Sequence, residues 1–197
     1  MDFASQNLTA GQLNAIVKKL GGEQDALRFL RGELVVSAVK AAEMPVWKTV
    51  KLGTCKTPDE YRKALKSAGR RIGDWGDDIL GRITCSKKEI DLDLVVLSVA
   101  DLGFKSGARY ADICAKAVEL GLELCPAEVG PALRLQYGDQ PNGEWLRIAM
   151  EAITGRDGHL DIFNVEHDDD GLWLDGYDGH PGLVWYADRR FVFGRRK

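Results

Sequence analysis

Residues 120–153 read LGLELCPAEVGPALRLQYGDQPNGEWLRIAMEAI and separate two parts of the chain that have different sequence patterns. Before this stretch, helical and extended patterns alternate. After it, the segments have the length and the turn signals of short strands. The stretch also contains the Cys125-Pro126 step. We therefore take it as the boundary between an N-terminal region, residues 1–125, and a C-terminal region, residues 126–197.

These patterns predict an α+β fold. The N-terminal region is expected to mix helices and strands, and the C-terminal region to form an antiparallel β-meander of five to six strands, with a small closed barrel as one option. No long linker separates the two regions. We expect them to pack as one compact unit or as two tightly docked subdomains.

In the N-terminal region, apolar residues at helical spacing and glycine stops predict two short helices joined as a hairpin. Extended and helical patterns then follow each other. The expected helices are 10–20, 23–31, 58–68, 70–82 and 108–120, and the expected strands are 34–36, 46–52, 91–100 and 122–125.

In the C-terminal region, the alternation of apolar and polar residues over 133–137 predicts a half-buried strand. Asp-Gly pairs, which suit tight hairpin turns, recur between the later apolar segments. The expected strands of the meander are 144–153, 160–166, 172–177, 183–186 and 190–193.

The formal net charge is −3, so the whole chain has no basic field for a nucleic acid or an anionic membrane. The charge is nevertheless uneven, because residues 48–71 carry eight Lys and Arg against two acids, whereas residues 126–197 carry eight against thirteen. The N-terminus lacks a secretory pattern, and no apolar run reaches the roughly 20 residues of a membrane helix. The sequence predicts a soluble cytoplasmic protein, with reduced cysteines at Cys55, Cys85, Cys114 and Cys125.

The basic segment allows a nucleic-acid hypothesis. Two helices over 58–82 would resemble a helix-turn-helix in outline, with basic residues where phosphate contacts are made. Gly73 and Gly76 are unfavourable in a recognition helix, and a solvated basic helix face is the simpler interpretation. The residues of this hypothesis are Lys63, Lys66, Arg70 and Arg71.

A further hypothesis, a small hydrolase or transferase that depends on Cys and Glu, rests on the polar residues of the central stretch. Cys125 precedes a possible helix N-terminus, which would favour a thiolate nucleophile. Glu128 and Glu144 could form a carboxylate pair for acid–base chemistry, and Arg134 could hold an anion. The simpler interpretation is a buried inert cysteine and a solvated rim of glutamates, so the sequence favours a protein that is not an enzyme.

Metal and cofactor motifs are weak. The cluster 168–170 fails the EF-hand pattern, because its glycine comes too early and no glutamate follows. No phosphate-binding glycine loop occurs. His159, His167 and His180 lie in or beside predicted turns and do not form a metal-ligand pattern. We therefore expect neither a metal site nor a cofactor.

Aromatic residues are concentrated in the acidic β half, and interfaces often use such residues as anchors. The leading hypothesis is therefore a non-catalytic protein that binds a protein partner, or a second copy of itself, through this half. We expect the contacts to involve Trp173, Tyr177, Trp185 and Tyr186.

The runs GLELCPAEVGPALRLQY and GEWLRIAMEAI, together with the C-terminal segment 185–197, resemble a family of bacterial hypothetical proteins of about this length. The similarity covers most of the chain, from LNAIVKKLGG onward. No activity is assigned to that family. The resemblance thus implies a free-standing bacterial protein and carries over no catalytic residue.

Overall fold

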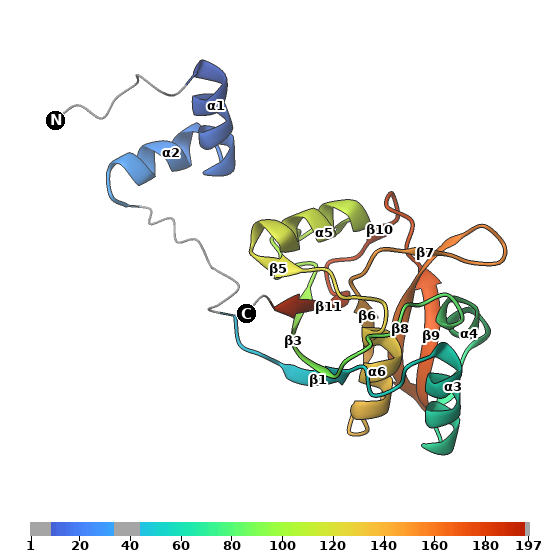
Figure 1. Ribbon diagram of the computed structural model, residues 1–197. Coiled ribbons are helices and arrows are strands. Elements are labelled where there is room, and N and C mark those ends of the chain that lie inside the picture. The colour runs from blue at the N-terminus through green and yellow to red at the C-terminus, as the bar shows by residue number, and fades with distance from the viewer. Residues whose placement is uncertain (1–8, 34–43, 196–197) are drawn as a thin grey trace. The chain divides into compact units, whose positions relative to one another are not determined.

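The computed structural model describes residues 9–33 and 44–195. The chain forms two compact units, residues 1–39 and 40–197, which we describe separately (Figure 1). The predicted strand 34–36 lies outside the described residues. No helix in the described ranges is long and apolar enough to cross a membrane.

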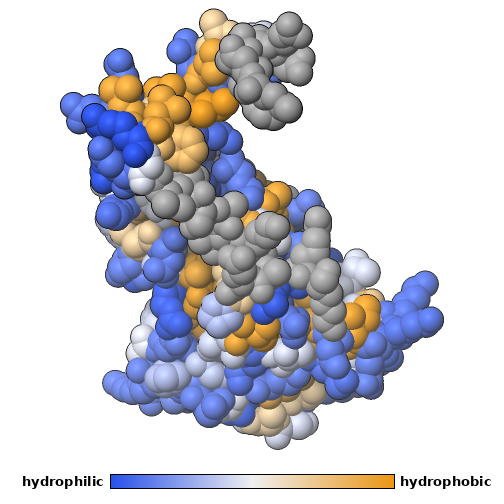
Figure 2. Space-filling view, turned by 90° about the vertical axis from the view of Figure 1, so that its left-hand side faces the viewer, coloured by the Kyte–Doolittle hydropathy of each residue, from blue (hydrophilic) through white to orange (hydrophobic). Residues whose placement is uncertain are grey.

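The first unit contains the predicted helical hairpin, α1 (Ala10–Lys19) and α2 (Glu23–Leu30). Thr9 caps α1, because its side chain accepts from the Gln12 amide while the Gln12 side chain accepts from the Thr9 amide. Gly21 and Gly22 make the turn with positive φ. Apolar side chains remain exposed on the hairpin (Figure 2, orange, top of the view); they are Leu13, Ile16, Leu27, Phe29 and Leu30.

The second unit is built on a mixed sheet of nine strands that curls into a half-barrel, which confirms the α+β class. The strand order is β1-β3-β11-β6-β8-β9-β2, with β5 beside β11 and β7 beside β8. The strands are β1 (Lys48–Leu52), β2 (Arg71–Ile72), β3 (Ile90–Ser98), β5 (Leu122–Glu123), β6 (Trp145–Ile148), β7 (Ile153–Thr154), β8 (Leu160–Asp168), β9 (Gly171–Asp178) and β11 (Arg190–Arg195). A separate two-stranded sheet joins β4 (Ala108–Arg109) to β10 (Val184–Trp185).

Four helices cover this sheet. Helix α6 (Val129–Gln136) contacts β1, β8 and β9, and α3 (Pro58–Ser67) packs on α6. Helix α4 (Asp74–Leu80) packs on β8 and β9. Helix α5 (Tyr110–Glu119) packs against β4 and β5, away from α3 and α4 (Figure 1).

A single hydrophobic core runs through the second unit and includes residues from both sides of position 125. Leu94 of β3, Leu133 of α6 and Phe193 of β11 are all fully buried. Strands β3 and β5 precede position 125 and pair with β11, which follows it. The predicted central strand in the first region is confirmed, because β3 lies between β1 and β11.

The predicted strand 133–137 is wrong, because these residues belong to helix α6 and its C-cap. Pro131 lies in the first turn of the helix, where no amide donor is needed, and therefore does not break it. Of the two polar positions, only Gln136 is exposed, whereas a half-buried strand would expose both. Arg134 is buried, and the Gln136 side chain bonds the Lys51 amide and carbonyl.

The predicted helix 70–82 is also wrong in its first part. Arg71 and Ile72 form β2, which pairs in parallel with β9, and the helix begins only at Asp74. The glycines allow close packing on β9: a Cβ on Gly73 would lie 2.2 Å from Asp175 Cγ, and one on Gly76 would lie 2.7 Å from Asp175 Cα. Arg70 and Arg71 therefore do not lie at the start of a second helix, where the helix-turn-helix hypothesis needs basic residues.

The prediction of an antiparallel meander is correct only in part. The hairpin β8–β9 forms with the expected neighbours, and β6 pairs antiparallel with β8. The predicted strand 144–153 is divided into β6 and β7, β10 leaves the main sheet, and β11 inserts between β3 and β6, parallel to β6. The physical reason is burial, because residues 191–194 are all buried, which requires a strand with neighbours on both sides and layers on both faces.

Candidate functional site

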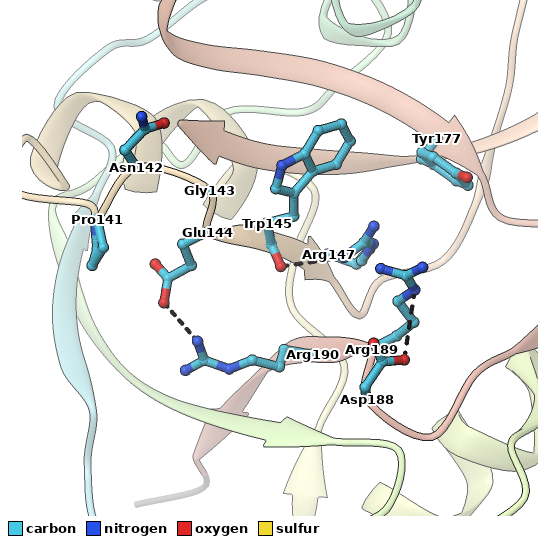
Figure 3. Close-up of a pocket in the computed structure, with 10 residues that line it drawn as sticks. All are labelled: Pro141, Asn142, Gly143, Glu144, Trp145, Arg147, Tyr177, Asp188, Arg189 and Arg190. Atoms are coloured by element: carbon cyan, nitrogen blue, oxygen red, sulfur yellow. Dashed lines mark hydrogen bonds and ion pairs between the residues drawn. The ribbon is translucent and has the colours of Figure 1, made fainter. Parts of the chain in front are cut away.

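An open cavity of about 760 Å³ lies where β6, the end of β9 and the turn before β11 meet (Figure 3). This volume falls in the range of ligand-binding sites, roughly 300–1,000 Å³. The residues that line the cavity are Pro141, Asn142, Gly143, Glu144, Trp145, Arg147, Tyr177, Asp188, Arg189 and Arg190.

The sheet brings these distant segments together. Strand β8 pairs with β6 on one side and with β9 on the other, and β11 pairs with β6 on its free side. Trp145 and Arg147 alternate along β6 and therefore share one face of the sheet. Tyr177, near the end of β9, joins them from across β8 (Figure 3).

Arg147 is the unusual residue of this cavity. It is only 4% exposed, and its guanidinium lies within 6 Å of three aromatic ring centres, those of Trp145, Tyr177 and Trp185. Its Nη1 donates to the Trp145 carbonyl at 3.2 Å, whereas its buried Nε has no hydrogen-bond partner in the described ranges. Among the same residues, no carboxylate lies within ion-pair distance of it.

The charge of Arg147 is therefore compensated only beyond ion-pair distance, by the carboxylates of Glu166 and Asp188. Burial lowers the pKa of Arg147 from its ordinary value, and neighbouring Arg189 lowers it further. A buried arginine normally has a carboxylate or phosphate partner with which its fork can form two hydrogen bonds. An anion placed in the cavity would supply that partner.

The rim carries the two other arginines. Arg190 Nη1 donates to Glu144 Oε1 at 2.6 Å, and the Tyr137 hydroxyl donates to Glu144 Oε2 at 2.7 Å (Figure 3 shows the first contact). Arg189 Nε lies 3.8 Å from Asp188 Oδ1. The lining thus has three arginines and two carboxylates, and Arg147 is the arginine left without an acidic partner.

A second titratable group lies next to the cavity on the same face of the sheet. Glu166 of β8 pairs directly with Trp145 on β6 and with Trp173 on β9. Burial raises the pKa of Glu166 to about 7, with further contributions from Asp175 and Asp168. Asn164 Nδ2 donates to its Oε2. The protonated form of Glu166 is consequently favoured over a wider pH range than for an exposed glutamate.

The four predicted catalytic residues do not share a cavity. Cys125 is buried, its thiol contacts the Val192 carbonyl at 3.5 Å, and burial raises the pKa of Cys125, which is the opposite of an activated nucleophile. Cys125 borders a different cavity, near Glu151, whereas Glu144 lines the cavity with Arg147, which we call the arginine cavity.

The other two residues hold the fold together. Glu128 is buried and accepts four hydrogen bonds, from the Gly53 amide, the Tyr61 hydroxyl, and the amide and hydroxyl of Ser86. Arg134 is fully buried and donates to Gln140 Oε1 and to the carbonyls of Glu166 and Tyr137. Burial lowers the pKa of Arg134 to about 10.

The predicted interface aromatics occupy different environments. Trp185 is buried and packs on Tyr177 and Phe191, with ring centres 5.1 and 5.2 Å apart. Tyr177 is 43% exposed and lines the cavity, and Tyr186 is exposed beside Arg189. Trp173 is partly buried, and its indole donates to Asp168 at 3.0 Å.

The predicted nucleic-acid residues lie on α3 and around β2. Lys63 and Lys66 are exposed on α3, and Arg71 is exposed above the Trp173 ring at 5.0 Å. Arg70 is partly buried, and its Nε is buried without a hydrogen-bond partner in the described ranges. None of the four lines the arginine cavity.

The three histidines are likewise separate in their contacts. His159 lies beside Asp157, His167 Nδ1 contacts the Gln140 carbonyl at 2.6 Å, and the His180 ring accepts from the Gly182 amide. In the part of the chain that is described, no group of three or more His, Cys, Asp or Glu side chains could hold a metal ion.

Reasoning from the sequence identified Glu144 and Tyr177 but missed Trp145, Arg147, Arg189 and Arg190. One signal was present: Arg147 stands within WLRI, an otherwise apolar strand, and a charged residue in such a position needs a special environment. Arg189 and Arg190 carry no such signal, because they lie in the turn before β11 and at the first position of that strand, where charged residues are common.

Comparisons with protein-family models, with curated proteins and with solved structures found no match to this chain. The resemblance to a bacterial family therefore stays a prediction, and the function has to be argued from the cavity itself.

Proposed function

We propose that the protein is a non-catalytic binding protein that holds an acidic segment of a protein partner in the cavity around Arg147. The observation that carries this proposal is the buried Arg147 guanidinium, which has three aromatic neighbours and an Nε without a hydrogen-bond partner in the described residues. A carboxylate from a partner would complete its hydrogen bonds and compensate its charge.

The aromatic lining supports a peptide as ligand. Trp145 is 40% exposed and Tyr177 is 43% exposed, so each ring offers surface at the cavity. Trp, Tyr and Arg are the residue types that most often dominate binding energy at protein interfaces. An acidic residue with an apolar or aromatic neighbour would fit both kinds of group.

The surrounding charge favours such a segment over a nucleic acid. Glu144 and Asp188 belong to the lining itself, and the C-terminal half has an excess of acidic residues. A strand of phosphates would meet these carboxylates, whereas a single carboxylate can reach Arg147 between them. The basic residues of α3 lie outside this cavity.

The proposal can be tested by selection from a phage library of random linear dodecapeptides. We expect enrichment of sequences in which Asp or Glu is next to an apolar or aromatic residue. A synthetic peptide of the selected consensus should lose at least tenfold in affinity, measured by calorimetry, when Arg147→Met removes the guanidinium. This variant should fold, because replacing a buried charge by an apolar side chain of similar length is often neutral or stabilising.

Lys63→Met is the matched control, since it removes the same charge from an exposed position on α3. Arg190→Gln provides a second test at the rim of the cavity. Selection without any acidic preference, or equal affinity of the Arg147→Met and Lys63→Met variants, would refute the proposal.

A further inference from the structure

A second cavity, of about 480 Å³, adjoins the first and has the opposite charge. Tyr177 lines both cavities. The second lining contains three aspartates and no lysine or arginine; its residues are Trp75, Asp157, His159, Asp161, Gly176, Tyr177, Asp178 and Leu183.

Two of these aspartates face each other on neighbouring strands. Asp161 of β8 and Asp178 of β9 are direct partners in the antiparallel register. Like charges in this position destabilise a sheet. Burial raises the pKa of Asp161, and the nearby carboxylates of Asp157 and Asp178 raise it further. His159 opposes this shift, and within residues 9–33 and 44–195 no lysine or arginine forms an ion pair with Asp161 or Asp178.

Among the three aspartates, Asp161 is the one with a buried oxygen that accepts no hydrogen bond in the described residues. It is 7% exposed, and its Oδ2 is buried without a hydrogen-bond partner in the described part of the chain. The other two are engaged: Asp157 Oδ1 accepts from the His159 amide at 3.0 Å, and Asp178 Oδ1 accepts from the His180 amide at 2.7 Å. An occupant with N–H donors and a positive charge would satisfy Asp161.

Aromatic rings complete this lining. Trp75 is 42% exposed and Tyr177 is 43% exposed. The guanidinium of Arg156, from the same chain, lies 5.5 Å from the centre of the Trp75 ring, so this ring already has a cationic neighbour. Carboxylates together with exposed aromatic faces suit an ammonium or guanidinium group carried on an apolar stem.

We propose that the second cavity binds a basic side chain, lysine or arginine, of the same partner segment whose acidic residue binds at Arg147. This inference rests on the proposed function, because it takes the occupant of the first cavity as given. Tyr177, as the wall between the cavities, would separate the basic residue from the acidic one. The partner segment would thus be recognised by two opposite charges, each placed where the protein has an unsatisfied buried group.

The two unsatisfied atoms explain why both charges are needed. Arg147 Nε requires an acceptor and Asp161 Oδ2 requires a donor. A segment with only acidic residues would satisfy the first atom and be repelled by the three aspartates. The charge pattern therefore selects against simple polyanions, including nucleic acids.

The experiment uses the full chain and a defined probe, Nα-acetyl-arginine-N-methylamide, followed by two-dimensional NMR of the labelled protein. We expect saturable shifts of the Trp75 indole and of the amides of residues 157–161. Asp161→Asn, which keeps the side-chain shape, should weaken this binding at least fivefold, and Asp178→Asn should do the same. Asp170→Asn, in the exposed turn between β8 and β9, is the control and should bind the probe like the original protein.

A second arm separates this inference from the proposed function. Peptides selected on the original protein should contain a basic residue at a fixed spacing from the acidic one, and peptides selected on Asp161→Asn should keep the acidic residue only. Acidic peptides without a basic preference, or probe shifts equal in Asp161→Asn and Asp170→Asn, would overturn the inference while leaving the first cavity intact. If Asp161→Asn does not fold, Asp178→Asn gives the same decision.

Discussion

Replacing Glu166 by glutamine should make the protein more stable at alkaline pH and leave its stability unchanged at acidic pH. The carboxyl group is buried between Trp145 and Trp173 on the sheet face. Burial, with Asp175 and Asp168, raises the pKa of Glu166 from its ordinary 4.5 to about 7, and Arg147 opposes this only in part. The folded state thus disfavours the charged form.

The direction follows from proton linkage. Below pH 4.5 the carboxyl is neutral in both the folded and the unfolded protein, so no penalty exists. Between pH 4.5 and 7 the folded protein holds the proton more tightly, and its stability falls as the pH rises. Above pH 7 the charged carboxylate is present in both states, and the penalty is complete.

The magnitude can be bounded. The difference between 4.5 and about 7 corresponds to about 3 kcal/mol, because each tenfold change in proton affinity is worth about 1.4 kcal/mol. Glu166 is 7% exposed and not fully buried, so part of its charge is screened and we expect about 1–2 kcal/mol at pH 8. Glutamine can still accept the hydrogen bond from Asn164.

The assay is urea unfolding of both proteins at pH 4, 5.5, 7 and 8, followed by tryptophan fluorescence. All five tryptophans lie in the unit of residues 40–197, so the signal reports this unit. Glu151→Gln, at an exposed position, serves as the control. If the stability difference between Glu166→Gln and the original protein is the same at pH 4 and pH 8, burial does not raise the pKa of Glu166 as described.

Three further outcomes follow from the packing. Glu128→Gln should destabilise the second unit by about 3 kcal/mol in urea unfolding, since its amide group would face donors from Gly53, Tyr61 or Ser86; a loss below about 1 kcal/mol would contradict this structural role. Gly76→Ala should destabilise by about 2 kcal/mol in thermal unfolding, because its Cβ would lie 2.7 Å from Asp175 Cα, whereas Gly11→Ala on α1 meets only Thr9 Oγ1 at 3.9 Å and should not. Cys125 should be the last cysteine modified by iodoacetamide at pH 8, as read by mass spectrometry, because burial raises the pKa of its thiol; modification as fast as that of the partly exposed Cys55 would argue against its buried position.

Local sequence patterns were sufficient to predict those helices, strands and turns whose determining contacts are local. Thr57 and Pro58 predict the start of α3, the apolar run of β3 predicts a covered strand, and the Asp-Gly turn predicts the β8–β9 hairpin. In each case the deciding contacts lie within a few residues of each other. Sequence reasoning succeeds there because the physical cause is local.

Sequence reasoning failed to predict which strands pair with each other in the sheet. Nothing near residues 190–195 says that β11 will lie between β3 and β6, since its partners are about 40 and 95 residues earlier in the chain. The arginine cavity has the same origin, because Arg147 and Arg190 meet only once β6 and β11 are neighbours. The strand prediction for α6 failed for another reason. Arg134 and Gln136 are polar and hydrogen-bond other parts of the chain, and their two-residue spacing matches the alternation of a half-buried strand.

The position of β11 has a consequence for how the protein is made. Synthesis runs from the N-terminus, so β3 and β6 leave the ribosome well before residues 190–195. Until β11 arrives, each of them has an unpaired edge, and such edges readily join strands of other chains. The middle of the sheet is therefore completed last, and a chain interrupted before residue 190 would present two open edges at once. Protection of these edges during synthesis, by a chaperone or by rapid completion of the chain, would govern the yield of folded protein.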